Sequence, residues 1–165
     1  MLIKDRARDE AEQARAKYWD GVFPVDPVKI AVALGMNVYT AVLPEGESGR
    51  IVKEQGKPAE IYLAVDEPDR RQNYTCAHEL GHWFERRIQE DDEYSFVDHR
   101  DDSQPKDAHE WFAEWFAAYL LMPTKEFIDA VDDGLTVDRL TRRFGVTPTA
   151  ARNRARNLGV SIDRG

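Results

Sequence analysis

Residues 75–84 read Thr75-Cys76-Ala77-His78-Glu79-Leu80-Gly81-His82-Trp83-Phe84. In an α-helix, residues four apart lie one turn apart on the same side, so His78 and His82 can direct their imidazoles to one point. Two imidazoles leave two tetrahedral positions of a Zn²⁺ for other ligands. Glu79 is rotated by about 100° from His78, so it borders this point without having to bind the ion.

A carboxylate beside two metal-binding histidines can take a proton from an attacking water, and this His-Glu-x-x-His pattern occurs in zinc proteases. The alternative is a surface patch in which the spacing arose by chance. Three features favour the metal site. The flanking Leu80, Trp83 and Phe84 are apolar, which predicts a buried helix whose imidazoles need partners. The small Ala77 and Gly81 allow another element to approach closely, and a second pair of carboxylates follows downstream.

The composition is that of one soluble globular domain, or of one domain with a small appendage, with 165 residues, 42% hydrophobic and 33% charged. A net charge of −8 argues against general nucleic-acid binding. The single cysteine, Cys76, excludes an internal disulfide and is interpreted as a small core residue. No apolar run has transmembrane length and the N-terminus is too charged for a secretory signal, so we expect a cytoplasmic protein without a membrane partner.

The residues before the motif predict two helices followed by strands. Charge-dense residues 3–19 carry alanines at helical spacing, and a short helix at 28–34 is capped by Asp26. Strand character follows at 36–43, a turn cluster at 46–49, and a hairpin of two strands at 50–53 and 60–65. An exposed edge of this sheet could pair with an extended peptide, or the sheet could only support the helix behind it, and both alternatives stay open.

The motif helix is expected to end at about Arg87. Residues 90–102 are rich in acids, which predicts a mobile loop. Such a loop could recruit basic substrate segments, but a solvated surface loop is the favoured interpretation.

A helix predicted at residues 106–122 carries the second pair of carboxylates, Glu110 and Glu114, one turn apart. Its broad apolar side predicts that most of its surface is buried; this side comprises Ala108, Trp111, Phe112, Trp115, Tyr119 and Met122. An unpaired carboxylate in such a place costs several kcal/mol. A zinc ion held by the two histidines would compensate that cost.

Two short helices at residues 137–144 and 149–158, around a turn at Gly145, have the pattern of a helix-turn-helix. This tail is basic, with Arg139, Arg142, Arg143, Arg152, Arg154 and Arg156. DNA contact is the alternative considered, but packing onto the chain's own domain is favoured. We therefore expect a core over residues 1–123, including the N-terminal helix, and a helical extension over 124–165 packed on it.

With these residues in place, the chain resembles the ImmA/IrrE family of metallopeptidases, a branch of the gluzincin-type zinc proteases. The resemblance extends from about Val22 onward. It is carried by residues 24–27 before a helix ending in Leu34-Gly35, by Ser48-Gly49, by residues 74–82 and 110–123, and by Leu140, residues 144–147 and Leu158-Gly159. The implied fold is α+β: a small antiparallel or mixed sheet packed on a zincin-type pair of helices, with a small C-terminal helical segment.

The resemblance also implies a ligand set. The family's third zinc ligand is a glutamate three residues before an Ala-Asn pair, which places this role on Glu110, since Ala113 follows. The family's Asn is replaced here by Glu114, which either orients His78 or binds the metal itself. His109, His99 and Asp98 are weaker ligand candidates. One Zn²⁺ per chain is expected, with Mn²⁺ as the alternative.

The mechanistic hypothesis assigns the metal to His78, His82 and Glu110, and the role of general base to Glu79. Tyr74, Tyr94 or His99 is expected to stabilise the oxyanion, and the sequence does not choose among them.

The resemblance implies a specific protein substrate: a helix-turn-helix repressor or an antitoxin encoded nearby, in a mobile element or a stress response. The competing hypothesis is a non-proteolytic, metal-bound regulatory or toxin–antitoxin module that acts by protein or DNA binding. Glu79 favours catalysis, because a structural zinc site needs no general base and usually closes all four positions.

Overall fold

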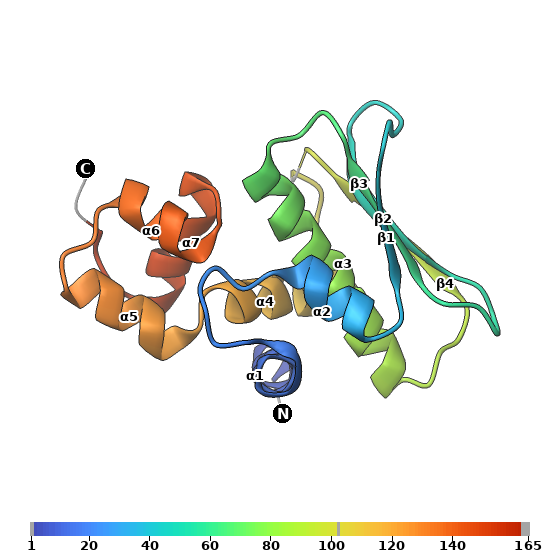
Figure 1. The fold of residues 1–165 in the computed structure, drawn as a ribbon, viewed down its shortest axis with the longest axis horizontal. Coiled ribbons are helices and arrows are strands. Elements are labelled where there is room, and N and C mark those ends of the chain that lie inside the picture. Colours follow the sequence, from blue (N-terminus) through green and yellow to red (C-terminus); the bar gives the residue numbers. More distant parts are fainter. Residues whose placement is uncertain (1, 102, 163–165) are drawn as a thin grey trace.

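The computed structural model describes residues 2–101 and 103–162 (Figure 1). It confirms the α+β class. In chain order the described elements are α1 (Ile3–Tyr18), α2 (Pro27–Ala33), β1 (Asn37–Ala41), β2 (Glu47–Lys53), β3 (Glu60–Ala64), α3 (Asp69–Ile88), β4 (Tyr94–His99), α4 (Ala108–Leu121), α5 (Thr124–Asp132), α6 (Val137–Phe144) and α7 (Pro148–Leu158). None of the described helices is both long and apolar enough to cross a membrane.

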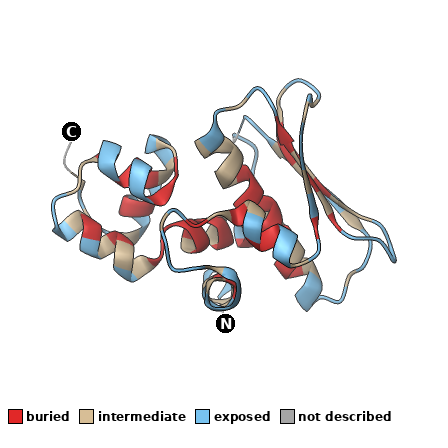
Figure 2. Ribbon diagram, viewed as in Figure 1, coloured by how far each residue is buried: buried red, intermediate tan, exposed pale blue. Residues whose placement is uncertain are grey.

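The four described strands form one mixed sheet in the order β1-β3-β2-β4. β1 runs parallel to β3, whereas β2 is antiparallel to both β3 and β4. The predicted hairpin of β2 and β3 is confirmed, with Ile51 opposite Ile61. Both isoleucines are buried, and α3 contacts β2, β3 and β4, so the sheet is a support for the motif helix (Figures 1 and 2).

The prediction of a loop over the whole of residues 90–102 is wrong, because residues 94–99 form the edge strand β4. The acids on either side hid a short run of strand-forming residues, among them Tyr94, Phe96 and Val97. This run completes the backbone hydrogen bonding of β2, with Val97 opposite Arg50. The predicted turn cluster at 46–49 is also partly wrong, since β2 already begins at Glu47 and has an irregular register there. The helix α5 was not predicted.

Helices α3 and α4 pack closely because α3 has no side chain at Gly81. A Cβ built there would lie 2.9 Å from the Ala113 Cα and 3.1 Å from the Phe116 Cβ. On another side α4 packs against α1, whose small residues Ala7 and Ala11 are fully buried. The helix that carries the second carboxylate pair is thus held between two others.

Helices α5–α7 lie at the opposite end of the molecule from the sheet (Figure 1). Phe144 of α6 packs edge-on against Phe23, with ring centroids 5.1 Å apart. The buried Arg154 of α7 donates from Nε to the carbonyl oxygen of Met122 at 3.0 Å. These contacts join the C-terminal helices to the rest of the chain. The domain division at residues 123 and 124 stays a prediction.

Candidate metal centre

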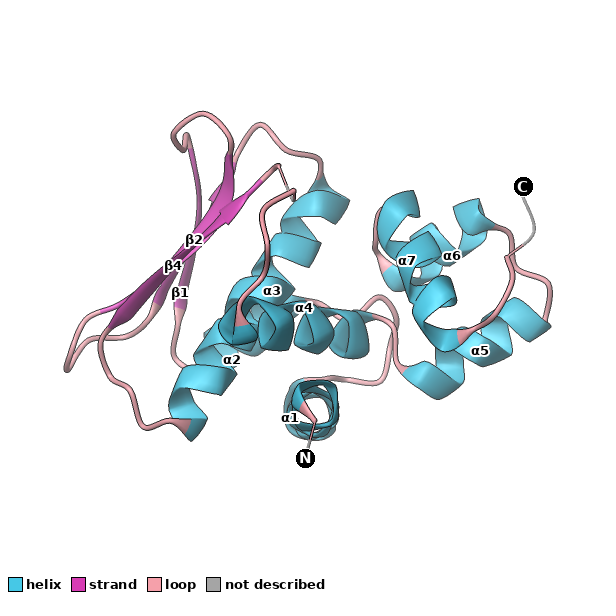
Figure 3. Ribbon diagram, turned by 180° about the vertical axis from the view of Figure 1, so that it is seen from behind, coloured by secondary structure: helices cyan, strands magenta, loops and turns pink. Residues whose placement is uncertain are grey.

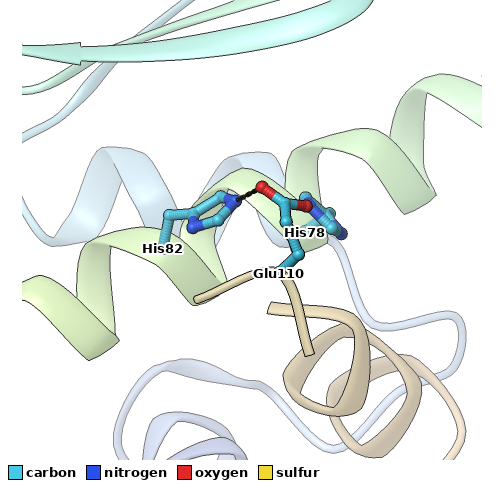
Figure 4. A group of neighbouring side chains, drawn as sticks. All are labelled: His78, His82 and Glu110. Carbon is cyan, nitrogen blue, oxygen red and sulfur yellow. Dashed lines mark hydrogen bonds and ion pairs between the residues drawn. The ribbon is translucent and has the colours of Figure 1, made fainter. Parts of the chain in front are cut away.

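Three side chains from two helices converge on one point. Nε2 of His78 lies 2.9 Å from Oε2 of Glu110, and Nε2 of His82 lies 3.0 Å from Oε1 of the same carboxylate. Figure 4 shows the Glu110 carboxylate facing both imidazoles. The helical repeat of α3 aligns the two histidines, and the close approach of α4 at Gly81 brings Glu110 to them.

The donor atoms fit a divalent metal ion. His78, His82 and Glu110 each offer one ligand atom, all within 4.8 Å of one another, so the three residues could hold an ion. His78 and His82 are 1% and 0% exposed, and the two His82 nitrogens lack hydrogen bonds of good geometry among the described residues. Buried imidazoles without such partners are costly, and a metal ion that accepts their lone pairs removes that cost.

Glu79 adjoins this cluster and is wholly buried, with neither carboxylate oxygen hydrogen-bonded within the described chain. Burial raises the pKa of Glu79 well above its usual value, against the opposing effect of His78. A carboxylate held in this way is a strong proton acceptor, because it lacks the hydrogen bonds that would stabilise its charge.

Two neighbours contact the imidazoles. Oε1 of Glu114 lies 3.1 Å from Nδ1 of His78, on the side of the ring opposite to Glu110. The ring of Phe96 in β4 stacks on His82, with centroids 4.0 Å apart and planes at 4°. In this geometry Glu114 is placed to orient His78 rather than to join the three converging ligand atoms.

The carboxylates dominate the electrostatics of the centre. Burial lowers the pKa of His78, but Asp98, Glu110 and Glu114 outweigh it and raise that pKa well above its usual value. Burial opposes ionisation of Glu110, yet the adjacent imidazoles of His78 and His82 outweigh it and bring the pKa of this carboxyl far below the usual range. The pKa of Glu114 is also lowered, since His78 overcomes the effect of burial. Burial, by contrast, lowers the pKa of His82. The surrounding carboxylates thus favour positive charge at His78 and not at His82.

The structure brings three further candidates of the sequence to the edge of the centre. Asp98 of β4 offers an oxygen within 4.8 Å of ligand atoms of His78 and Glu79. Tyr74 and His99 line a cavity of about 270 Å³ together with Asp98 and Glu114. Tyr74 and His99 are therefore the two oxyanion candidates whose cavity adjoins the centre, through Asp98 and Glu114.

Two other candidates are directed elsewhere. Nδ1 of His109 lies 2.7 Å from Oε1 of Glu85, so His109 is paired with a carboxylate outside the metal-binding cluster. Tyr94 lines a separate cavity with Lys53 and Trp83. The predicted apolar side of α4 also has an exception, since Trp111 is 46% exposed.

The sequence did not identify Phe96 as a site residue, although it stacks on His82. Alternation of larger side chains over residues 94–98 was the available signal, but the surrounding acids obscured it.

The model of the IrrE N-terminal-like domain family, a family of peptidases, matches residues 31–156. No curated protein matches the chain. Among solved structures, a transcriptional regulator of Mycobacterium tuberculosis has a similar fold, with a TM-score of 0.63 and 17% sequence identity. The similarity covers 100% of this chain and 55% of the regulator, so the chain spans about half of that protein's length. The family resemblance inferred from the motifs is confirmed, and the chain belongs to the IrrE N-terminal-like domain family.

Proposed function

We propose that the chain is a zinc-dependent endopeptidase that cleaves a specific protein partner in the cytoplasm. The observation that carries this proposal is the buried Glu79 carboxylate, which has no hydrogen-bond partner among the described residues and adjoins the His78, His82 and Glu110 cluster. A purely structural metal site has no use for such a group. Membership of a peptidase family supports the same conclusion.

The roles of the side chains follow from their positions. A zinc ion, or alternatively Mn²⁺, held by His78, His82 and Glu110 would activate a water and polarise the scissile carbonyl. Glu79 takes the proton of the attacking water and returns it to the leaving amine. Glu114 keeps His78 in its metal-binding orientation. Tyr74 or His99 donates a hydrogen bond to the developing oxyanion from the adjoining cavity.

We propose that the substrate is a helix-turn-helix repressor or an antitoxin encoded nearby. The open edge of β4 supports a peptidic substrate, because β4 is the last strand of the described sheet and carries Asp98 beside the centre. An extended segment of the partner can add to such an edge by main-chain hydrogen bonds.

The second candidate function is a metal-bound regulatory or toxin–antitoxin module without proteolysis. The observation that favours it is the helix pair α6 and α7, whose α6 ends at Gly145 in the left-handed conformation, as in a helix-turn-helix. The neighbour from Mycobacterium tuberculosis is itself named a transcriptional regulator.

Co-expression with the product of the neighbouring gene separates the two functions. We expect the partner to be shortened by the wild-type chain, to stay intact with Glu79→Gln, and to be shortened again with Glu12→Gln, an exposed control in α1. The Glu79→Gln protein should still bind zinc and melt cooperatively. An intact partner in a stable complex with the wild-type protein would instead support the non-proteolytic regulatory function.

A further inference from the structure

The cavity beside the metal centre continues into a second one between α4 and α7. This second cavity has a volume of about 350 Å³. The two cavities share four lining residues: Tyr74, Glu114, Ala150 and Asn153. We call them together the α4–α7 groove. In Figure 3, α7 lies on the side of the C-terminal helices that faces α3 and α4. A peptide bound across the metal centre therefore has a path along α7.

The α4 wall of the groove is aromatic. Trp111 and Trp115 line the second cavity, and Trp111 is 46% exposed although it is a large apolar side chain. Nζ of Lys106 lies 5.6 Å from the centroid of the Trp111 ring. This wall offers an apolar surface with a cation at its rim, which suits a ligand that is part apolar and part anionic.

The α7 wall is polar and cationic. Arg156 is exposed and donates from Nη1 to Oδ1 of Asn153 at 3.2 Å. Beneath the wall, Arg154 is 1% exposed, and its Nη1 has no hydrogen-bond partner in the described chain. The recorded hydrogen-bond partners of Arg154 and Arg156 among the described residues are a carbonyl, a hydroxyl and an amide oxygen, and none is a carboxylate. Neither charge is thus neutralised by a carboxylate of the described residues, although Arg154 donates to Met122 and, from Nη2, to Oγ1 of Thr124.

The charge of the second cavity is opposite in sign to that of the whole chain. Arg154 and Arg156 line it, and Glu114, the carboxylate among its lining residues, is already engaged by His78. The chain as a whole carries a net charge of −8. A local cationic surface on an acidic protein attracts anionic ligands and repels cationic ones.

We propose that the α4–α7 groove binds an acidic segment of the peptide substrate, with a carboxylate of that segment at Arg156 and an adjacent apolar side chain on Trp111. This inference rests on the proposed peptidase function, because it treats the bound peptide as a substrate. It deepens that function by naming acidic peptide segments as the class that is selected. Helix α7, which resembles the recognition helix of a helix-turn-helix, then binds peptide instead of DNA.

DNA is the other polyanion to which an arginine-rich helix could bind, and the placement of the arginines separates the two. Arg156 lines the groove, whereas Arg152 is exposed on the same helix and lines neither cavity. A phosphate backbone would contact both arginines, because binding to DNA sums many charges over a broad surface. A peptide in the groove would contact Arg156 but not Arg152.

The test measures binding separately from cleavage. Zinc-loaded, full-length Glu79→Gln protein is titrated into fluorescein-labelled peptides of Ala, Leu and Ser whose central pair is Asp-Glu, Asn-Gln or Lys-Lys, and anisotropy is recorded. We expect the Asp-Glu peptide to bind about tenfold more tightly than the Asn-Gln peptide, equivalent to about 1.4 kcal/mol. Added Arg156→Glu should abolish this preference, and added Arg152→Glu should leave it unchanged.

Three results would overturn the inference: equal affinities for the three peptides, absence of binding at millimolar peptide, or equal losses from Arg156→Glu and Arg152→Glu. Displacement of the peptide by duplex DNA that depends on both arginines would also overturn it. The outcome is independent of the peptidase proposal. Glu79-dependent cleavage without a preference for acidic peptides would contradict the groove inference only. An Arg156-dependent preference for acidic peptides in a protein that cleaves nothing would contradict the peptidase function only.

Discussion

Gly81 of α3 lies directly against the backbone of Ala113 in α4, so that a Cβ built at Gly81 would be 2.9 Å from the Ala113 Cα and 3.2 Å from its carbonyl oxygen. Ala113 follows Glu110 by three residues, which is about one helical turn. The contact therefore sets the distance at which the Glu110 carboxylate meets the two imidazoles. The metal centre depends on how closely two helices can pack.

Replacement of Gly81 by Ala should push α4 away from α3, because the obstructing atoms belong to backbone and not to a flexible side chain. We expect a loss of about 1–3 kcal/mol in the free energy of unfolding, typical of an overpacked core. Zinc affinity should also fall, because Glu110 moves with α4. Thermal unfolding and zinc titration against a chromophoric chelator measure the two effects, and wild-type affinity in a stably folded Gly81→Ala protein would contradict this account.

Glu110 and Glu114 should differ in their effect on metal binding. Glu110 faces the Nε2 atoms of both histidines, whereas Glu114 contacts Nδ1 of His78. We expect Glu114→Gln to weaken zinc binding by about 10–100-fold, as loss of a group that orients a ligand does, and Glu110→Gln to weaken it more. The same chelator titration measures both variants. The reverse order would make Glu114 the ligand.

Metal removal should destabilise the protein, since His78, His82 and Glu79 are buried and are left with polar atoms that lack good hydrogen bonds among the described residues. At a free zinc concentration about 100 times the Kd, binding adds about 2.7 kcal/mol to the folded state. We expect a chelator to lower the melting temperature by several degrees and added zinc to restore it. The Glu110→Gln protein is the control, and its melting temperature should respond far less to zinc.

A salt-bridge network near the C-terminal end of α3, formed by Glu85, Arg86 and His109, should make stability depend on pH. Burial raises the pKa of Glu85, but hydrogen bonds from Arg86 and His109 outweigh it and bring the pKa below its ordinary value. A depressed pKa means that the ionised form stabilises the folded state above the unfolded pKa, and that this contribution is lost as the pH falls through the folded value.

Glu85→Gln should therefore destabilise the protein at neutral pH by about 1–2 kcal/mol, the range for hydrogen bonds to a charged group. The difference between wild type and variant should shrink below about pH 4.5, near the ordinary pKa of a glutamate. Urea unfolding at a series of pH values measures it. A difference that stays constant from neutral to acidic pH would show that the charge of Glu85 contributes nothing.

Local patterns in the sequence were sufficient for the parts of the fold that rest on local physics. The alanines of α1, the Asp26 cap of α2 and the left-handed Gly145 at the end of α6 are set by helical repeat and capping, and the structure has each of them. The edge strand β4 was missed because its partner β2 lies far earlier in the chain, with Arg50 opposite Val97. This pairing, not the local composition, makes residues 94–99 extended.

The sequence by itself determined that His78 and His82 share one face of a helix with Glu79 beside them, because a helix of 3.6 residues per turn leaves no other arrangement. Only the tertiary structure decided which distant side chains meet that face. Glu110, Glu114 and Asp98 come to it, whereas His109 pairs with Glu85 and Tyr94 lies in another cavity. Such convergence depends on packing distances between elements far apart in the chain, such as that between Gly81 and Ala113, and no local periodicity encodes those distances.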